Sequence, residues 1–167
     1  MDRLWAPWRM RYILEEDQPQ GCIFCLAKDG AGADGLVLGV GDLSLVMMNK
    51  YPYNNGHVLV APVRHVGELS DLSKEEQGDL LATVDFTIQA IRKEMNPDGL
   101  NVGLNLGRSA GAGIEDHLHF HIVPRWHGDV NFMTVFGEVR VIPEHIKATY
   151  QKLKPHFSGL NRSKGDP

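Results

Sequence analysis

The residues in this sequence best suited to chemistry are three histidines at alternate positions, His117, His119 and His121. In an extended chain, successive side chains point to opposite faces, so we expect the three imidazoles on one face of a strand. The residues between and after them are apolar and are expected on the opposite, buried face: Leu118, Phe120 and Ile122. Because each imidazole nitrogen needs a hydrogen-bonding partner, such a row suits a core poorly and indicates a chemically active face.

A glycine-rich turn precedes the histidine row, with Gly107, Gly111 and Gly113 among its residues. Backbone without side chains allows amide N–H groups to approach an anion closely. The turn is not a dinucleotide-binding fingerprint, because no G-x-G-x-x-G segment opens a helix here. Together, the turn and the histidine row predict phosphate chemistry.

Two further histidines flank a predicted strand over residues 57–62, since His57 opens it and His65 follows its end. The two cysteines, Cys22 and Cys25, form a C-x-x-C pair that fits a disulfide, a redox pair or half of a metal site. The βαβ pattern typical of a redox dithiol is not seen around them. A metal site needs two further ligands, for which the histidines are the candidates.

Helical periodicity is strongest over residues 73–95, where Ser73 and Glu76 form a capping box. A stripe of apolar residues recurs at helical spacing and is expected to face the core: Leu81, Val84, Ile88, Ile91 and Met95. This long helix is interpreted as scaffold. Pro143, at a first-turn position, opens a second predicted helix that ends near residue 153.

Strands are expected at five places, with Pro124 ending the last: residues 36–40, 43–48, 57–62, 100–106 and 117–123. Strands, a long helix, more strands and a closing helix favour an antiparallel sheet with helices packed on it, the α+β class. We divide the chain into an aromatic N-terminal arm (residues 1–20), one domain (residues 21–157) and a flexible tail (residues 158–167).

The composition excludes several classes of function. At 167 residues, the chain is long enough for one domain with a real core. Its formal net charge of −4 argues against a general nucleic-acid binder, which needs a basic excess. No apolar run approaches the roughly 18–20 residues of a membrane span, and the N-terminus lacks the apolar centre of a signal peptide. We therefore expect a cytoplasmic protein with reduced thiols that binds neither nucleic acid nor membranes.

The segment 117–123, HLHFHIV, resembles the signature of the histidine-triad family. The segment 49–62 resembles the family's other nucleotide-contacting segment, and Cys22 and Cys25 stand where zinc-binding members carry cysteines. Three further segments resemble the bacterial diadenosine-polyphosphate phosphorylases of that family: LWAPWRMRYI, NVGLNLGRSAGAG and HIVPRWHGDVNFM. The resemblance covers about residues 3–145.

The resemblance implies a five-stranded antiparallel sheet with one long and one C-terminal helix. It also implies that two subunits pair into one continuous sheet in a homodimer. In the implied mechanism, His119 attacks the α-phosphorus of a nucleotide and becomes a transient nucleotidyl-histidine. His57 and His121 would contact phosphate oxygens and stabilise the charge that develops as the leaving group departs.

A substrate site and a metal site are also implied by the resemblance. For a purine nucleotide or dinucleoside polyphosphate, Asn49 would hold the ribose hydroxyls, Asn105 would lie near the scissile phosphate, and His121 would bind a phosphate oxygen. Backbone N–H groups would complete the phosphate cradle at three glycines: Gly107, Gly111 and Gly113. One structural zinc ion per chain would be held by a closed set of four ligands: Cys22, Cys25, His65 and His117. No organic cofactor is implied.

One departure from the family's pattern bears on the reaction. Many hydrolytic members carry a polar Gln or Ser shortly before the triad, where this chain has Ala112, Gly113 and Ile114. This difference leaves inorganic phosphate, rather than water, as a credible acceptor. The leading hypothesis is cleavage of diadenosine tetraphosphate with phosphate or water as the acceptor, giving ADP and ATP when the acceptor is phosphate. The alternatives are a nucleoside phosphoramidate or adenylyl hydrolase and, from another class, a non-catalytic zinc-stapled nucleotide-binding module.

Overall fold

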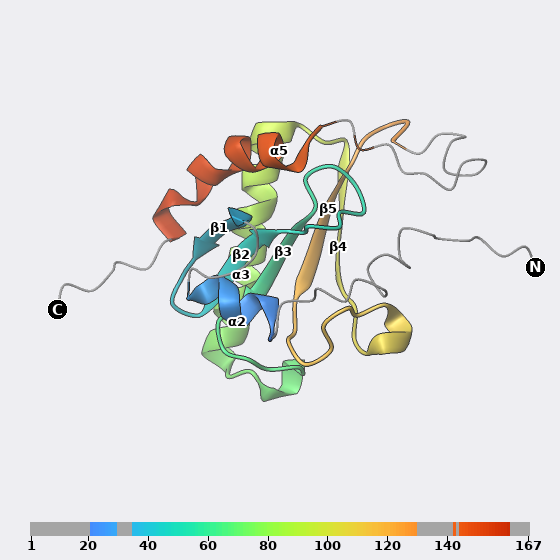
Figure 1. Cartoon of the computed structure of the whole chain (residues 1–167). Helices are drawn as coiled ribbons and strands as arrows, with labels where there is room; N and C mark the ends of the chain where they lie inside the picture. The colour runs from blue at the N-terminus through green and yellow to red at the C-terminus, as the bar shows by residue number, and fades with distance from the viewer. Residues whose placement is uncertain (1–20, 30–34, 130–141, 143, 161–167) are drawn as a thin grey trace, which may run out of the picture.

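The computed structural model describes residues 21–29, 35–129, 142 and 144–160. Within them, five strands form one antiparallel sheet in the order β1-β2-β3-β5-β4 (Figure 1). The strands are β1 Val37–Val40, β2 Ser44–Met48, β3 Val58–Pro62, β4 Gly99–Leu104 and β5 Phe120–Arg125. The predicted α+β class with a five-stranded antiparallel sheet is therefore confirmed. The predicted aromatic arm lies outside the described residues.

The described helices are α2 Ile23–Lys28, α3 Lys74–Met95 and α5 Ile146–Leu153, with 3₁₀ segments η2 Leu69–Asp71, η3 Arg108–Ala110 and η4 Lys154–Leu160. The capping box that opens α3 is confirmed. The Ser73 side chain accepts a hydrogen bond from the Glu76 backbone N–H (3.1 Å), and the Glu76 carboxylate accepts one from the Ser73 backbone (2.8 Å). α5 begins at Ile146 rather than at the predicted residue 143. His145 caps it, because its Nδ1 accepts a hydrogen bond from the Lys147 backbone N–H (3.2 Å).

The predicted apolar stripe of α3 is confirmed at four residues, of which Val84 and Ile91 lie in the core and Ile88 and Met95 pack against it, but not at the fifth. Leu81 is 59% exposed, whereas its neighbour Leu80 is 1% exposed. Thr83 and Thr87 are also buried, and the Thr87 hydroxyl donates to the Thr83 carbonyl oxygen (2.7 Å). Because a helix can satisfy a threonine hydroxyl with its own carbonyl groups, these polar residues occupy core positions that an apolar pattern does not reveal.

The two faces of the sheet are covered by different helices, with α3 behind the sheet and α2 in front of it in the view of Figure 1. The larger core joins the sheet to α3 and α5 and includes Val46, Val58, Ile91, Ile122 and Leu153. On the other face, α2 buries Phe24 against β2 and β3, next to Leu45, Met47, Leu59 and Ala61. The sheet is therefore packed on both sides, and a site on the α2 side must lie beside that helix.

Pro124 does not end the last strand as predicted, because β5 continues to Arg125. β4 pairs with β5 along its whole length, with Leu100 opposite Pro124, whereas β3 pairs with it only as far as Ile122. On that side, the Pro124 carbonyl oxygen accepts a hydrogen bond from the Asn54 side chain (3.0 Å). The nitrogen and carbonyl of one strand residue point to the same side, so the missing N–H of Pro124 removes no bond to β4.

The folded part of the chain extends past the predicted domain end at residue 157. The segment η4 reaches Leu160, which packs against the larger core. A Cβ placed on Gly39 of β1 would lie only 3.1 Å from Leu160 Cβ, so the two residues are in close contact. Residues 158–160 lie in η4, and residues 161–167 of the predicted tail lie outside the described residues. Among the helices described, none has the length and apolar character needed to cross a membrane.

Candidate active site and metal centre

The histidine row lies on the α2 side of the sheet, where β5 begins. His121 is in β5, and His119 and His117 precede the strand, which begins at Phe120 rather than at residue 117. The predicted alternation of faces nevertheless holds. The rings of His119 and His121 are 4.9 Å apart, and Phe24 of α2 contacts the rings of His117 and His119, each at 4.9 Å. The intervening apolar residues are buried in the core beside α3: Leu118 and Ile122.

One hydrogen bond fixes the position of the proton on His119. Its Nδ1–H donates to the carbonyl oxygen of His117 (2.8 Å), so Nε2 carries a lone pair. His119 is 7% exposed, and this burial lowers its pKa, which keeps the imidazole neutral at pH 7. A neutral imidazole with a lone pair at Nε2 and a tethered Nδ1 is a competent nucleophile.

A chain of hydrogen bonds sets the protons of His57 and His121. His57 Nδ1 accepts from the Tyr53 backbone N–H (3.0 Å) and from Asn49 Nδ2 (3.2 Å), so its proton is on Nε2. His57 Nε2–H donates to His121 Nδ1 (3.0 Å), which places the His121 proton on Nε2. Asn105 Nδ2 lies 3.3 Å from that nitrogen. Because two N–H groups cannot donate to each other, the amide must be turned over so that Oδ1 accepts from His121. The relay thus ends on a His121 N–H that a phosphate oxygen can accept in place of the Asn105 amide.

His121, the last member of the relay, is a neutral group rather than a cation. The pKa of His121 is lowered to about 4, mainly by burial and to a smaller extent by the neighbouring His119. The Tyr53 ring covers both members of the relay, at 4.6 Å from the His57 ring and, nearly parallel, at 5.5 Å from the His121 ring. Tyr53 is 40% exposed, so it lies between these rings and solvent. No sequence motif marks Tyr53 as a site residue, and only its place four residues before His57 indicates such a role.

The four predicted metal ligands converge beside His119. Their donor atoms all lie within 4.8 Å of one another: Cys22 Sγ, Cys25 Sγ, His65 Nδ1 and His117 Nδ1. His117 Nδ1 is 3.1 Å from Cys22 Sγ, 3.8 Å from Cys25 Sγ and 3.2 Å from His65 Nδ1. Cys25 Sγ is 3.3 Å from His65 Nδ1. A tetrahedral zinc site with these ligand types has edges of roughly 3.3–3.8 Å, so the donor set fits a metal ion of this kind.

His117 connects the candidate metal ligands to His119. Its Nε2–H donates to the Pro62 carbonyl oxygen (2.8 Å), which turns an unprotonated Nδ1 toward the other ligands. Both cysteines are free thiols, and Phe24 between them packs on the rings of His117 and His119. The ring of His117 thus faces the other three candidate ligands, while its carbonyl oxygen accepts the hydrogen bond from His119 Nδ1–H.

Comparison with known proteins agrees with this geometry, because residues 32–128 match the model of the HIT domain. The chain belongs to the histidine-triad (HIT) domain family. The AP-4-A phosphorylase of Mycobacterium tuberculosis is 41% identical over 166 residues, 95% of this chain and 85% of the relative. The adenosine 5'-monophosphoramidase hnt1 of Schizosaccharomyces pombe is 32% identical over 132 residues, 79% of this chain and 95% of the relative. A zinc-bound histidine triad family protein from Mycobacterium smegmatis has a similar crystal structure, with a TM-score of 0.67 and 26% identity over 84% of this chain and 95% of that chain.

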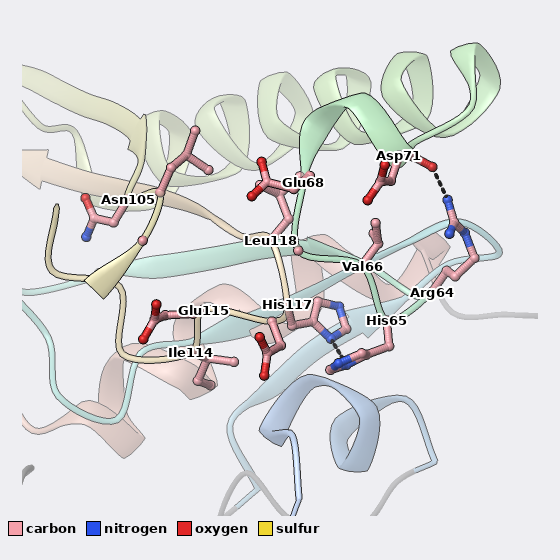
Figure 2. A pocket seen from close by; sticks show the side chains of 14 residues that line it. Arg64, His65, Val66, Glu68, Asp71, Asn105, Ile114, Glu115, His117 and Leu118 are labelled. Carbon is pink, nitrogen blue, oxygen red and sulfur yellow. Dashed lines mark hydrogen bonds between the residues drawn. The ribbon is translucent and has the colours of Figure 1, made fainter. Parts of the chain in front are cut away.

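In this HIT domain, the glycine turn borders a cavity of about 650 Å³ (Figure 2). Gly107 and Gly111 bracket η3 with φ values of 77° and 93°, a region that favours glycine. The cavity is lined by residues 64–68, Asp71, 105–107 and 114–118. Of the predicted substrate residues, Asn105 and Gly107 line it, whereas the other glycines of the cradle, Gly111 and Gly113, do not. His57, His119 and His121 also lie outside its lining.

The charge of this cavity is unsuited to a polyphosphate. Four carboxylates belong to its lining: Glu68, Asp71, Glu115 and Asp116. Arg64, the arginine in that lining, donates to Glu76 from Nε (2.7 Å) and Nη2 (2.9 Å), so its charge is already paired. Glu115 is likewise paired, with Arg108 Nε (2.9 Å), which leaves the carboxylates of Glu68, Asp71 and Asp116 to set the charge of the cavity. Because like charges repel, the interior of the cavity suits a polyphosphate less well than the neutral donors of the histidine row and the Asn105 amide.

Proposed function

We propose that this HIT enzyme cleaves dinucleoside polyphosphates, diadenosine tetraphosphate in particular, through a nucleotidyl-His119 intermediate. The observation that carries the proposal is the His119 ring, which is neutral, tethered at Nδ1 to the His117 carbonyl oxygen (2.8 Å) and left with a lone pair on Nε2. His121 presents a hydrogen-bond donor beside it, at 4.9 Å between ring centroids. The similarity to an AP-4-A phosphorylase supports this substrate class.

The proposed reaction has two displacement steps. In the first, the Nε2 lone pair of His119 bonds to the α-phosphorus while the bond from phosphorus to the bridging oxygen breaks. The electron pair of that bond leaves with the departing nucleotide, and the His117 carbonyl stabilises the positive charge that the His119 ring gains. The His121 N–H and the Asn105 amide stabilise charge on the phosphate oxygens. In the second step, an acceptor oxygen bonds to the phosphorus and the electron pair of the phosphorus–nitrogen bond returns to Nε2.

We propose that the acceptor is inorganic phosphate, so that the products are ATP and ADP. Where many hydrolytic members carry Gln or Ser, this chain has Ala112, Gly113 and Ile114, which cannot activate water, and the Glu115 carboxylate that follows is paired with Arg108 (2.9 Å). The remaining proposed substrate contacts are Asn49, beside His57, and the backbone N–H groups of Gly107 and Gly113. The Gly111 N–H already donates to the Arg108 carbonyl oxygen (2.9 Å). A nucleoside phosphoramidate hydrolase is the second candidate, because the same first step serves it and a 32% identical relative bears that activity's name.

Product analysis on diadenosine tetraphosphate, with and without millimolar phosphate, tests this function. We expect ADP and ATP in equal amounts with phosphate and little turnover without it, because phosphate removes the nucleotidyl group from His119. AMP and ATP formed at the same rate without phosphate would identify water as the acceptor. No cleavage of this substrate, together with rapid hydrolysis of adenosine 5'-monophosphoramidate, would contradict the proposal and favour the second candidate.

We propose that Cys22, Cys25, His65 and His117 hold one zinc ion per chain with a structural role. Two thiolates and two imidazoles complete a tetrahedron, so no position is left for substrate or water. When bound, zinc would supply a cross-link between α2, the segment after β3 and the residues before β5. A cytoplasmic location suits this site, because a reducing compartment keeps both thiols available.

We also propose that two copies of the chain pair through β4. This strand is at the edge of the sheet and pairs only with β5 among the described strands. Its middle residues, 101–103, are exposed, and Val102 is 42% exposed. An unpaired strand edge is a template for a second strand, so antiparallel pairing of two copies would give one continuous sheet.

The mass in solution tests the pairing. We expect wild-type protein to have twice the chain mass of 18.6 kDa by light scattering at micromolar concentration. Val102→Asp places two carboxylates near each other across the paired strands and should shift the mass toward the monomer. Wild-type protein that remains monomeric at every concentration tested would contradict the proposal.

A further inference from the structure

The turn that carries His57 is buried at every residue, which is unusual for a connecting segment. Asn54, Asn55 and His57 are 9%, 9% and 0% exposed, and Gly56 between them is also buried. The His57 backbone N–H donates to the Asn54 carbonyl oxygen (3.2 Å) and closes the turn. A buried turn must find partners for its polar groups within the protein. The partners of Asn54 and Asn55 therefore identify what holds His57 in place.

Asn54 is held by the segment that includes the end of β5. Its Nδ2 donates to the Asp129 carboxylate (2.8 Å) and to the Pro124 carbonyl oxygen (3.0 Å). Arg125 in turn fixes both oxygens of Asp129, from Nε to Oδ2 (2.6 Å) and from Nη2 to Oδ1 (2.9 Å). The Trp126 backbone N–H also donates to Oδ2 (3.2 Å). The proposed reaction gives this segment no other role.

The rest of the turn is held by two helices. The buried Thr149 hydroxyl of α5 shares its one proton between Asn55 Oδ1 (3.0 Å) and the Glu144 carboxylate (2.8 Å). Gly56, with φ +71°, packs so closely that an added Cβ would lie 2.5 Å from Sδ of Met95, the last residue of α3. The turn of residues 54–57 is therefore held by three parts of the chain that are remote in sequence: residues 124–129, α5 and the end of α3.

We propose that Asp129 and Thr149 are positioning residues that act through Asn54 and Asn55 to fix the tautomer of His57. With the turn in place, the Tyr53 N–H meets His57 Nδ1, and the relay ends on a protonated His121 Nε2. If the turn loosens, His57 can take its proton on Nδ1, and its bare Nε2 then accepts from His121 Nδ1–H. His121 then presents a lone pair, rather than an N–H, to a phosphate oxygen.

Nitrogen-15 NMR of the imidazoles tests this inference without any substrate. In the wild-type protein we expect His57 and His121 both protonated at Nε2 and unprotonated at Nδ1. In Asp129→Ala and Asn54→Ala, the His57 shifts should move toward an average of the two tautomers. A wild-type His57 protonated at Nδ1 would overturn the inference, and so would variants that keep the wild-type shifts.

Kinetics provide the second measurement and rest on the proposed function. We expect Asp129→Ala and Asn54→Ala each to lower kcat about 10- to 100-fold, with a smaller change in KM, as expected for a misplaced catalytic group. The double variant should lose little more than either single variant, because both remove one contact. Independent, multiplying effects would contradict the inference. If diadenosine tetraphosphate is not turned over at all, the proposed function fails, while the NMR result still decides the inference.

Matched variants separate positioning from general destabilisation. Thr149→Val keeps the shape of the buried side chain but removes its hydroxyl, so it should fold and lower kcat, whereas Thr149→Ser should restore most of the rate. Glu94→Ala removes another carboxylate that joins distant elements, through its 2.9 Å contact with His156, but it does not touch the turn. It should leave kcat and the His57 shifts unchanged. Equal kcat for Thr149→Val and the wild type would exclude Thr149 from the positioning role.

Discussion

Replacing His119 with alanine is expected to lower kcat for diadenosine tetraphosphate by about 10³-fold or more, because the nucleotidyl group then has no atom to bond to. No neighbouring histidine can take over the role. His121 Nδ1 already accepts a hydrogen bond from His57 Nε2–H, and its Nε2 carries a proton rather than a lone pair. His117 Nε2 donates to the Pro62 carbonyl oxygen, and its Nδ1 faces the metal ligands. The donors that remain still stabilise charge, so a small residual rate is expected.

A single turnover with substrate labelled at the α-phosphate measures this effect directly. Wild-type protein quenched under alkaline conditions should retain the label as an acid-labile phosphoramidate, and His119→Ala should retain none. His127→Ala is the matched control, because it removes an exposed imidazole outside the site and should leave the rate unchanged. Wild-type activity in a correctly folded His119→Ala protein would show that the reaction does not pass through this residue.

Alternation along one segment accounts for what the sequence revealed of the site. Chain geometry sends every second side chain to the same face, so the common face of the imidazoles followed from their spacing alone. The exact start of the strand did not, because β5 begins at Phe120, where pairing with Val60 and Leu104 begins. The closeness of the four metal ligands followed from resemblance rather than from spacing, since Cys22 and His117 are 95 residues apart.

Contacts between remote polar residues were not predictable from local patterns. Asn54 and Asp129 are 75 residues apart, and neither lies on a periodic apolar face. The helix α2 has only six residues, too few to show a helical period around its cysteines. On α3, the apolar pattern predicted that Leu81 rather than Leu80 faces the core. It did so because the buried face includes two polar residues, Thr83 and Thr87, which an apolar pattern leaves out. These features depend on tertiary partners, which a single sequence does not display.

Removing the metal is expected to lower the melting temperature by about 10 °C, and the reason is the weakness of α2 by itself. A six-residue helix is too short to be stable alone, and its N-cap, Cys22, makes no capping hydrogen bond. A ligand present at a thousandfold excess over its Kd stabilises a protein by about 4 kcal/mol, and each kcal/mol shifts the melting temperature by about 2–4 °C in a chain of this size. Without zinc, the cover that Phe24 provides for His117 and His119 should loosen.

Metal analysis and melting of untagged protein, before and after chelation, measure this effect. His65→Ala is the informative variant, because this ligand is exposed and its loss leaves no cavity in the core; it should lose zinc and melt near the chelated protein, while His127→Ala keeps both values. Well under one zinc per chain in the wild type would contradict the site.

Because the ligand set is closed, folded His65→Ala should keep kcat within about tenfold of the wild type, in contrast to the loss of about 10³-fold expected for His119→Ala. A loss as large as that of His119→Ala in folded protein would mean that the metal acts on the reaction itself.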